Sequence, residues 1–327
     1  MRPIEADATT MISQADQRSI GDHGVRPVIG ILTWRGYEQT RNCLQSLVRL
    51  SDWPVPTVVV DNGSGTGEAE RLAREFGDPV SALTLADNGG VPAGYNAIMS
   101  WARKRGASHV LLLNNDTLIR DPDLLDQLIG ASGPDVAAAG PVIREGDGSV
   151  WAVGCWVDWI RGRARQHKAP PTDGKVPVDV EWLDGCCLFV SLDAAVSVGG
   201  FASEFFMYWE DVDWCVRAGR AGFRCVVHPA VEIVHLRGGS QPGLLARQYI
   251  LRNALLFVRR NGSASENVSS LAYFLLIRTP GEVLRSAWPP ARLVATCGAL
   301  AYAVWWNIHD AVGARRWRRA ATGPSVE

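Results

Sequence analysis

The chain has 327 residues, of which 47% are hydrophobic and 20% charged, and its formal net charge at pH 7 is −1. This composition is that of a globular protein with one large or two modest domains, and the balanced charge gives no reason to expect a nucleic-acid partner. The seven cysteines lack metal-ligand spacing, and their odd number, together with the lack of a signal-peptide pattern, favours reduced thiols in a cytoplasm. Residues 1–26 have no long apolar core, so we predict a disordered leader rather than an export signal.

Strands and helices are predicted to alternate in the first part of the chain. Apolar runs at residues 28–34, 57–60, 82–85 and 110–113 indicate buried strands, and the stretches between them have the apolar spacing of helices. This alternation indicates a parallel sheet covered on both faces. Polar residues gather just after the strands, at the edge where open α/β sheets bind ligands.

The second part is predicted to be less regular. Residues 136–141 and 185–190 indicate strands, and the arginine- and proline-rich stretch 161–177 indicates a mobile loop. A helix is expected to begin near Glu210, followed by two short strands at 223–227 and 231–235. Beyond residue 242 the pattern is helical. Residues 293–306 carry no formal charge but are fewer than the roughly 20 that a spanning helix needs. Their arginine flanks favour attachment to an anionic membrane surface, with a helical cap on the domain as the alternative.

Two polar segments that follow strands are candidates for nucleotide binding. Asp61 closes the second strand and can accept hydrogen bonds from a base or a ribose, although the sequence Asp-Asn-Gly-Ser is also a turn former. The stretch from Asn88 to Asn96 contains three glycines, which allow a ligand close to the backbone, and Gly94 precedes free helical N–H groups. The stretch is neither a Walker loop nor a dinucleotide fingerprint.

Two acidic clusters carry the most specific chemistry. Asp116, at the end of Asn114-Asn115-Asp116, suits a divalent metal shared with a diphosphate, with a strand-end Asx turn as the alternative. In Glu210-Asp211-Val212-Asp213, Asp213 lies four residues before Arg217 and is predicted to pair with it. Asp211 has no such partner, which makes it the candidate general base.

In their order and spacing these segments resemble the family 2 glycosyltransferases of the GT-A fold, especially the rhamnosyltransferase-like branch. The resemblance covers residues 27–240, and Arg252-Asn253 in the following helix is also similar to that branch. The matching segments are 31–40, 59–64, 88–96, 113–117, 185–189, 199–201, 206–217, 222–223 and 235–240.

The resemblance implies a Rossmann-like α/β fold with a mixed sheet flanked by helices. It places a GT-A domain at 27–241, with a nucleotide-sugar half at 27–117 and an acceptor half at 118–241. A C-terminal helical segment at 242–327, for which membrane association is the favoured expectation, follows.

The resemblance also implies transfer from a nucleotide-diphosphate donor, with dTDP-rhamnose the best guess, and inversion at the anomeric carbon. The acceptor would be a glycan, lipid-linked or natural-product hydroxyl. Asp116 and His235 would hold Mg²⁺ or Mn²⁺, and Asp211 would act as base with Glu210 beside it. Because Asn114 replaces the first carboxylate of the usual Asp-x-Asp, we expect modest metal affinity. Donor contacts are implied for Thr33, Asp61, Asn88, Gly94, Asn96 and Asn115, and acceptor contacts for Gly185, Trp209 and Arg237.

Three alternatives remain open at this point. One is a UDP-hexose-dependent transferase of the same fold, and another is a non-catalytic scaffold that binds a nucleotide sugar. A sugar nucleotidyltransferase would need a glycine-rich basic loop after the first strand, which residues 33–37 do not supply. The expected location is cytoplasmic and peripheral on the inner face of the cell membrane, with a homo-oligomer possible and no nucleic-acid partner.

Overall fold

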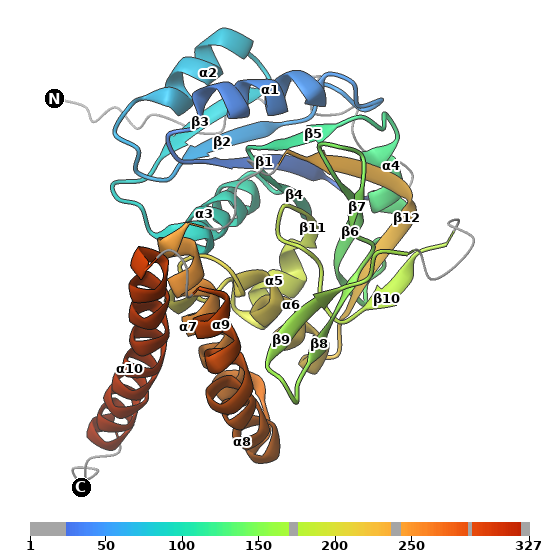
Figure 1. Ribbon diagram of the computed structural model, residues 1–327. Helices are drawn as coiled ribbons and strands as arrows, with labels where there is room; N and C mark the ends of the chain where they lie inside the picture. Colours follow the sequence, from blue (N-terminus) through green and yellow to red (C-terminus); the bar gives the residue numbers. More distant parts are fainter. Residues whose placement is uncertain (1–23, 170–175, 237–242, 287–289, 322–327) are drawn as a thin grey trace, which may run out of the picture.

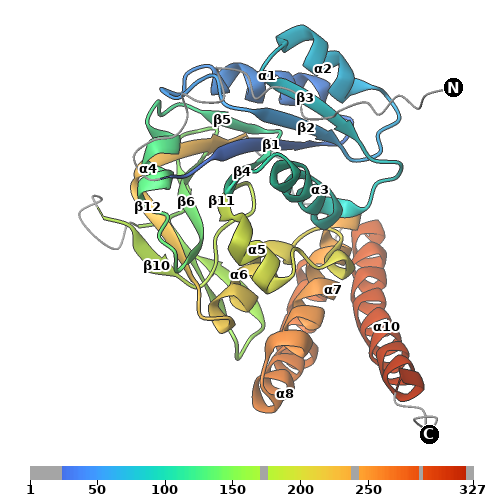
Figure 2. The same cartoon turned by 180° about the vertical axis from the view of Figure 1, so that it is seen from behind.

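The structure is a computed structural model that describes residues 24–169, 176–236, 243–286 and 290–321. It shows a twisted sheet flanked by helices, with a group of C-terminal helices extending from one side (Figures 1 and 2). Arg237 and all but the last three residues of the expected leader lie outside the described residues.

The first half of the chain forms the strands and helices that its apolar periodicity predicts. The strands are β1 (Pro27–Thr33), β2 (Thr57–Asp61), β3 (Val80–Thr84) and β4 (His109–Asn114), and the helices are α1 (Tyr37–Leu47), α2 (Glu68–Phe76) and α3 (Gly90–Lys104). Every residue of β1 and β2 is buried, as a sheet covered on both faces requires. Helices α1 and α2 cover one face and α3 covers the other (Figure 1).

The second half of the chain extends the same sheet. Its strands in this sheet are β5 (Thr117–Ile119), β6 (Val136–Glu145), β7 (Val150–Ala152), β10 (Val178–Val180), β11 (Cys187–Ser191) and β12 (Arg224–His235). Among the described residues the main order is β10-β12-β6-β11-β4-β1-β2-β3, with β5 beside β12 and β7 beside β6. Because β4 is parallel to β1 but antiparallel to β11, the sheet changes from parallel to mixed at β4. This confirms the expected mixed sheet.

Two expectations for the second half were wrong. The stretch predicted as a mobile loop contains β9 (Arg163–Gln166), which pairs with β8 (Cys155–Asp158) as a separate hairpin. The two short strands predicted at 223–227 and 231–235 form one strand, β12, whose pairing with β6 is interrupted by an irregularity between His228 and Glu232. The alternation of polar and apolar residues is lost at that bulge, which is why one strand resembled two.

The helices of the second half hold the strands and continue into the C-terminal group. They are α4 (Leu124–Gly130), α5 (Leu192–Val198), the short η1 (Ser203–Phe205), α6 (Glu210–Arg220), α7 (Leu244–Asn261), α8 (Ala264–Tyr273), the π-turn η2 (Phe274–Arg278), α9 (Thr279–Arg285) and α10 (Pro290–Ala321). Helix α10 lies against α7, where Asn307 Nδ2 donates to the carbonyl of Arg252 at 2.9 Å. None of the helices described is both long and apolar enough to cross a membrane.

Candidate active site

The carboxyl ends of β1, β2 and β4 bring the first predicted site residues together. Thr33 is opposite Asp61 in the register of β1 and β2, and Leu32 is opposite Asn114 in the register of β1 and β4. Because parallel strands end at the same edge, side chains separated by up to 81 residues in the sequence share one rim.

Asp61 is fully buried, and one of its two carboxylate oxygens has no hydrogen-bond partner among the described residues. Its Oδ1 accepts a hydrogen bond from the backbone N–H of Ser64 at 2.9 Å, and its Oδ2 is buried with no partner among the described residues. An unpaired buried acceptor costs about 1–3 kcal/mol, so this oxygen is suited to a donor group of a bound ligand.

Asn115 and Thr33 belong to one polar network that shapes the loop after β1. Asn115 Nδ2 lies 3.3 Å from Thr33 Oγ1 and 3.1 Å from Thr40 Oγ1. Thr33 in turn donates to Glu68 Oε1 at 2.8 Å, and Glu68 also accepts from the N–H of Gly36 at 3.2 Å. The network fixes the turn from β1 into α1, beside Asp61.

The glycine-rich segment links the two halves of the domain. Asn88 Oδ1 accepts from the N–H of Gly90 at 2.9 Å, at the start of α3. Gly90 has a φ of +78°, and a Cβ there would lie 2.1 Å from the carbonyl oxygen of Phe206. The N–H of Val91 donates to that same oxygen at 2.7 Å. Glycine is therefore needed for the donor-side loop to reach the segment that precedes Asp211.

Asp116 and His235 are adjacent, as the predicted metal pair requires. His235 Nε2 lies 3.0 Å from Asp116 Oδ1, and the antiparallel pairing of β5 with β12 places His235 opposite Thr117. Within the described ranges no group of three or more histidine, cysteine or acidic side chains is placed to hold a metal. A carboxylate and an imidazole fit a divalent ion that takes its other ligands from a diphosphate.

A cavity of about 320 Å³ lies between the donor rim and the acceptor half. Its lining includes Asn114, Trp151, Asp184, Glu210, Asp211 and His235. Tyr95 crosses its floor, with its hydroxyl 2.8 Å from Asn114 Oδ1 and 2.7 Å from the carbonyl of Gly185. The cavity thus extends from His235, the histidine of the candidate metal pair, to the candidate base Asp211.

Asp211 has the surroundings expected of a base that works near neutral pH. Its Oδ2 accepts from the N–H of Gly185 and its Oδ1 from the N–H of Val212, both at 2.8 Å. Burial, followed by repulsion from Asp184, raises the pKa of Asp211 to about 7 in spite of these hydrogen bonds. Burial, and then the charge of Asp211, raises the pKa of the neighbouring Glu210 well above its usual range.

The segment that leads into Asp211 has an unusual backbone. Phe206, Tyr208 and Trp209 have φ values of +63°, +65° and +74°. Such conformations of non-glycine residues cost of order 1–3 kcal/mol each and persist only where the surroundings fix them. Asn253 of α7 supplies the fixing contact, because its Nδ2 lies 2.8 Å from three acceptors in this segment, the carbonyls of Phe205, Met207 and Tyr208. Arg252 adds a hydrogen bond from Nη2 to the carbonyl of Phe205 at 2.9 Å.

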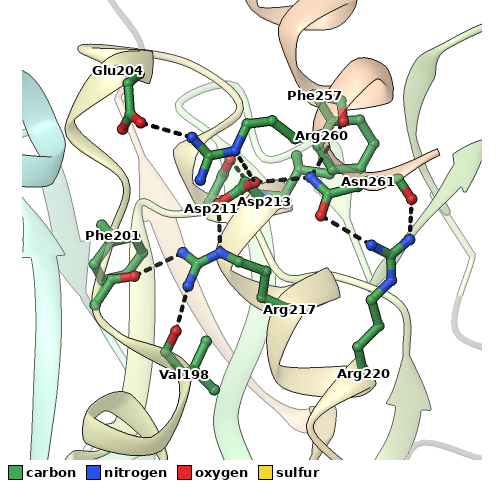
Figure 3. Close-up of polar contacts among 12 residues, drawn as sticks. Val198, Phe201, Glu204, Asp211, Asp213, Arg217, Arg220, Phe257, Arg260 and Asn261 are labelled. Carbon is green, nitrogen blue, oxygen red and sulfur yellow. Dashed lines mark hydrogen bonds and ion pairs between the residues drawn. The ribbon is translucent and has the colours of Figure 1, made fainter. Parts of the chain in front are cut away.

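Asp213 anchors α6 from the other side, and the prediction that it pairs with Arg217 is confirmed. Arg217 Nε lies 2.7 Å from Asp213 Oδ2, and Asn261 Nδ2 donates to Oδ1 of the same carboxylate at 2.8 Å (Figure 3). Arg217 also donates to the carbonyls of Val198 and Gly200, each at 2.7 Å. The fully buried Asp213 therefore ties the helix that presents Asp211 to both α5 and α7.

The remaining predicted residues have packing contacts in the structure. A Cβ on Gly94 would lie 2.2 Å from Leu32 Cδ1, so glycine lets α3 lie on β1. Both ends of the Asn96 amide bond to the backbone of Phe201, each at 2.9 Å, which joins α3 to the acceptor half. Trp209 lines the cavity and packs against Phe257, with ring centroids 5.0 Å apart.

The sequence prediction missed Asp184, Trp151 and the role of Asn253. Asp184 Oδ2 accepts from Trp151 Nε1 at 2.9 Å, and its Oδ1 accepts from the N–H of Cys186 at 3.2 Å. A signal for Asp184 was present, because it is an acidic residue after an apolar pair and directly before Gly185. Asn253 had only its resemblance to relatives as a signal.

Comparison with known proteins defines the class of protein. The sequence profile described as "Glycosyltransferase like family 2" matches residues 28–250, which is more than half of the chain. The chain therefore belongs to glycosyltransferase family 2, and it is an enzyme of the glycosyltransferase class.

Two relatives are rhamnosyltransferases by name. An N-acetylglucosaminyl-diphospho-decaprenol L-rhamnosyltransferase of Mycobacterium tuberculosis is 28% identical over 242 residues, which cover 66% of this chain and 77% of the relative. The dTDP-rhamnosyl transferase RfbF of Shigella flexneri is 24% identical over 254 residues, which cover 73% of this chain and 84% of the relative.

Solved structures share the GT-A fold. The mannosyltransferase PcManGT of Pyrobaculum calidifontis, in complex with GDP-Man and Mn²⁺, has a TM-score of 0.53 at 17% identity, over 89% of this chain and 82% of that one. S. aureus TarS (residues 1–349) in complex with UDP-GlcNAc has a TM-score of 0.55 at 14% identity, over 86% and 82% of the two chains. These likenesses confirm the expected fold class.

Proposed function

We propose that the protein transfers rhamnose from dTDP-rhamnose to a hydroxyl of a lipid-diphosphate-linked sugar, with inversion at the anomeric carbon. The observation that carries the proposal is a cavity lined by both His235, which lies 3.0 Å from Asp116, and Asp211, whose raised pKa of about 7 suits a general base. The names of the two rhamnosyltransferase relatives support the sugar, and the mycobacterial name supports the acceptor.

Each group has one task in this reaction. The Asp211 carboxylate takes the proton from the acceptor hydroxyl as that oxygen bonds to the anomeric carbon of the donor sugar. The bond from that carbon to the diphosphate breaks, and the nucleoside diphosphate leaves. A divalent ion held by Asp116 and His235 would offset the charge on the leaving diphosphate. Asp61 Oδ2 accepts a hydrogen bond from the base or ribose of the donor.

Binding of the donor should depend on the metal. In thermal melting with Mn²⁺, dTDP-rhamnose at 100 times its Kd should raise Tm by about 5 °C, because ligand binding stabilises the folded state. EDTA, or the substitution Asp116→Asn, should remove most of this shift, and Asp179→Asn should not, since Asp179 is an exposed carboxylate paired with Arg224. An undiminished shift in EDTA would eliminate the metal role. A larger Tm shift with a UDP-hexose than with dTDP-rhamnose would identify the UDP-hexose as the donor instead.

We further propose that the C-terminal helices attach to an anionic membrane surface. Leu276 and Leu284 are each 75% exposed, and Val294, Trp305 and Ile308 are also exposed on these helices. Burial of one such side chain contributes about 1.5–3 kcal/mol. This surface lies at the opposite end of the molecule from α1 (Figure 1).

Replacement of both exposed leucines should weaken vesicle binding. Leu276→Asp combined with Leu284→Asp should lower the fraction that sediments with anionic vesicles at least about tenfold, through lost apolar burial and added negative charge. Val48→Asp is the matched control, because Val48 follows α1 and is also half exposed. Equal sedimentation of the double variant and the wild type would refute attachment through these helices.

A further inference from the structure

A cluster of arginines lies where the β8–β9 hairpin meets the C-terminal helices. The hairpin turn is in contact with α8, because a Cβ on Gly162 would lie 2.2 Å from Ser270 Oγ. Trp159 stacks on Phe257 of α7 with ring centroids 5.2 Å apart, and the Arg161 guanidinium lies 5.9 Å from the ring centroid of Tyr273. The start of β9 is therefore held close to α8 and η2.

Three guanidinium groups converge at this junction, from Arg163 of β9, Arg247 of α7 and Arg278 of η2. All three side chains are partly buried. Burial lowers the pKa of Arg278 below its usual value; the charge of Glu282 opposes this shift, and the nearby positive charges of Arg163 and Arg247 add to it.

The cluster has more positive charge than its neighbours neutralise. Glu282, one turn after Arg278, forms an ion pair with Arg247 and a second one with Arg285 at 3.2 Å. Among the residues that the structure describes, neither Arg163 nor Arg278 forms an ion pair. Partly buried like charges repel unless an anion joins them, and guanidinium groups bind phosphate oxygens especially well.

The chain neighbours of the cluster line the cavity on one side and are exposed and apolar on the other. Ala164, next to Arg163, lines the cavity, and so does Ile250, one helical turn after Arg247. On the other side, the three residues before Arg278 are all exposed and apolar: Leu275, Leu276 and Ile277. Taken by their chain neighbours, the order is thus cavity-lining residues, then the arginines, then exposed apolar residues. A sugar linked through diphosphate to a hydrocarbon chain has the same order of chemical groups.

We propose that Arg163, Arg247 and Arg278 bind the diphosphate of a lipid-linked acceptor, whose sugar enters the cavity and whose hydrocarbon chain meets η2. This assignment rests on the proposed function, because it takes the acceptor to be a sugar joined to a lipid diphosphate. It gives the C-terminal helices a part in acceptor recognition as well as in membrane attachment.

Two acceptors with the same sugar test the assignment: a short-chain prenyl-diphospho-N-acetylglucosamine and octyl N-acetylglucosaminide. In Arg278→Gln and in Arg163→Gln, KM for the diphosphate acceptor should rise about 10- to 100-fold, because a charge-assisted hydrogen bond is lost. The kcat, the KM for the donor and the KM for the octyl glycoside should stay within about twofold. Arg285→Gln is the control, because Arg285 shares Glu282 and its side chain is 70% exposed. It should leave all four constants near those of the wild type.

Three results would overturn the arginine assignment. They are an unchanged KM for the diphosphate acceptor, equal rises for both acceptors, and weaker binding of Arg278→Gln to anionic vesicles without any change in KM. The last result would assign the cluster to phospholipid headgroups. Arg163→Gln, on the hairpin, keeps the test open if Arg278→Gln fails to fold. If the wild type itself uses the octyl glycoside but never the diphosphate acceptor, the acceptor class in the proposed function is wrong instead.

Discussion

Replacing Asp211 with asparagine should lower kcat about 10³-fold, because the acceptor hydroxyl then loses its general base. Donor binding should be unchanged, since both contacts of the carboxylate are with backbone N–H groups on the acceptor side. Removing the buried charge stabilises the folded state, and this gain offsets the loss of one hydrogen bond, because the amide NH₂ group cannot accept one. We therefore expect Tm at pH 8 to change by no more than about 3 °C.

The pH dependence of kcat identifies the base independently. The pKa of Asp211 is raised from 3.8 to about 7, so the carboxylate is protonated and inactive below pH 7. In the wild type kcat should rise about tenfold per pH unit up to pH 7 and then level off. Asp211→Asn should lack this limb, while Asp179→Asn should keep it. Wild-type turnover by Asp211→Asn would remove Asp211 as the base.

Replacing Asn253 with alanine should lower kcat about 10²-fold, even though Asn253 does not line the cavity. The change removes one hydrogen-bond donor from each of the carbonyls of Phe205, Met207 and Tyr208. The residues with positive φ can then relax, and the base moves away from its working position. We expect a loss of about 2–4 kcal/mol in the free energy of unfolding. Asn253 is thus assigned as a positioning residue.

The control for Asn253 is another buried asparagine on the same helix. Asn261 of α7 bonds to Asp213 and accepts from Arg220, but it does not contact the segment before Asp211 (Figure 3). Asn261→Ala should cost similar stability and leave the midpoint of the pH–kcat profile near 7. In Asn253→Ala, water can reach Asp211, so the midpoint should fall below 7. Equal midpoints in the two variants would mean that Asn253 is only structural.

Much of the donor half could be predicted from the sequence because each of its features is local. Asp61, Asn114 and Asp116 follow apolar strands directly, and parallel strands bring their carboxyl ends to one edge. The pairing of Asp213 with Arg217 followed from helical spacing alone.

The acceptor half was harder to predict because its contacts are distant in sequence. Asn253 acts on carbonyls 45 to 48 residues away, and nothing in a helical apolar pattern marks an asparagine as the support of a strained segment. Asp184 precedes β11 and Asp211 lies at the start of α6, so the two carboxylates interact only once the chain has folded. The alternating strand β9 was hidden because its arginines suggested a solvated loop.

The contrast between the two halves has a physical reason. In open α/β sheets ligands bind at the carboxyl ends of the strands, and this general rule can be applied to a sequence. The raised pKa of Asp211 depends on burial and on the charge of Asp184, which only the assembled cavity creates. The identity of the base could be proposed from the sequence, whereas its working pH could not.

Transfer itself is the most direct test of the proposed function. The wild-type protein would be incubated with dTDP-rhamnose, Mn²⁺ and prenyl-diphospho-N-acetylglucosamine, and the product analysed by mass spectrometry and NMR. We predict one added rhamnosyl group, one dTDP released for each transfer, and an anomeric configuration opposite to that of the donor. Retention of the donor configuration, or transfer from another nucleotide sugar but not from dTDP-rhamnose, would contradict the proposal.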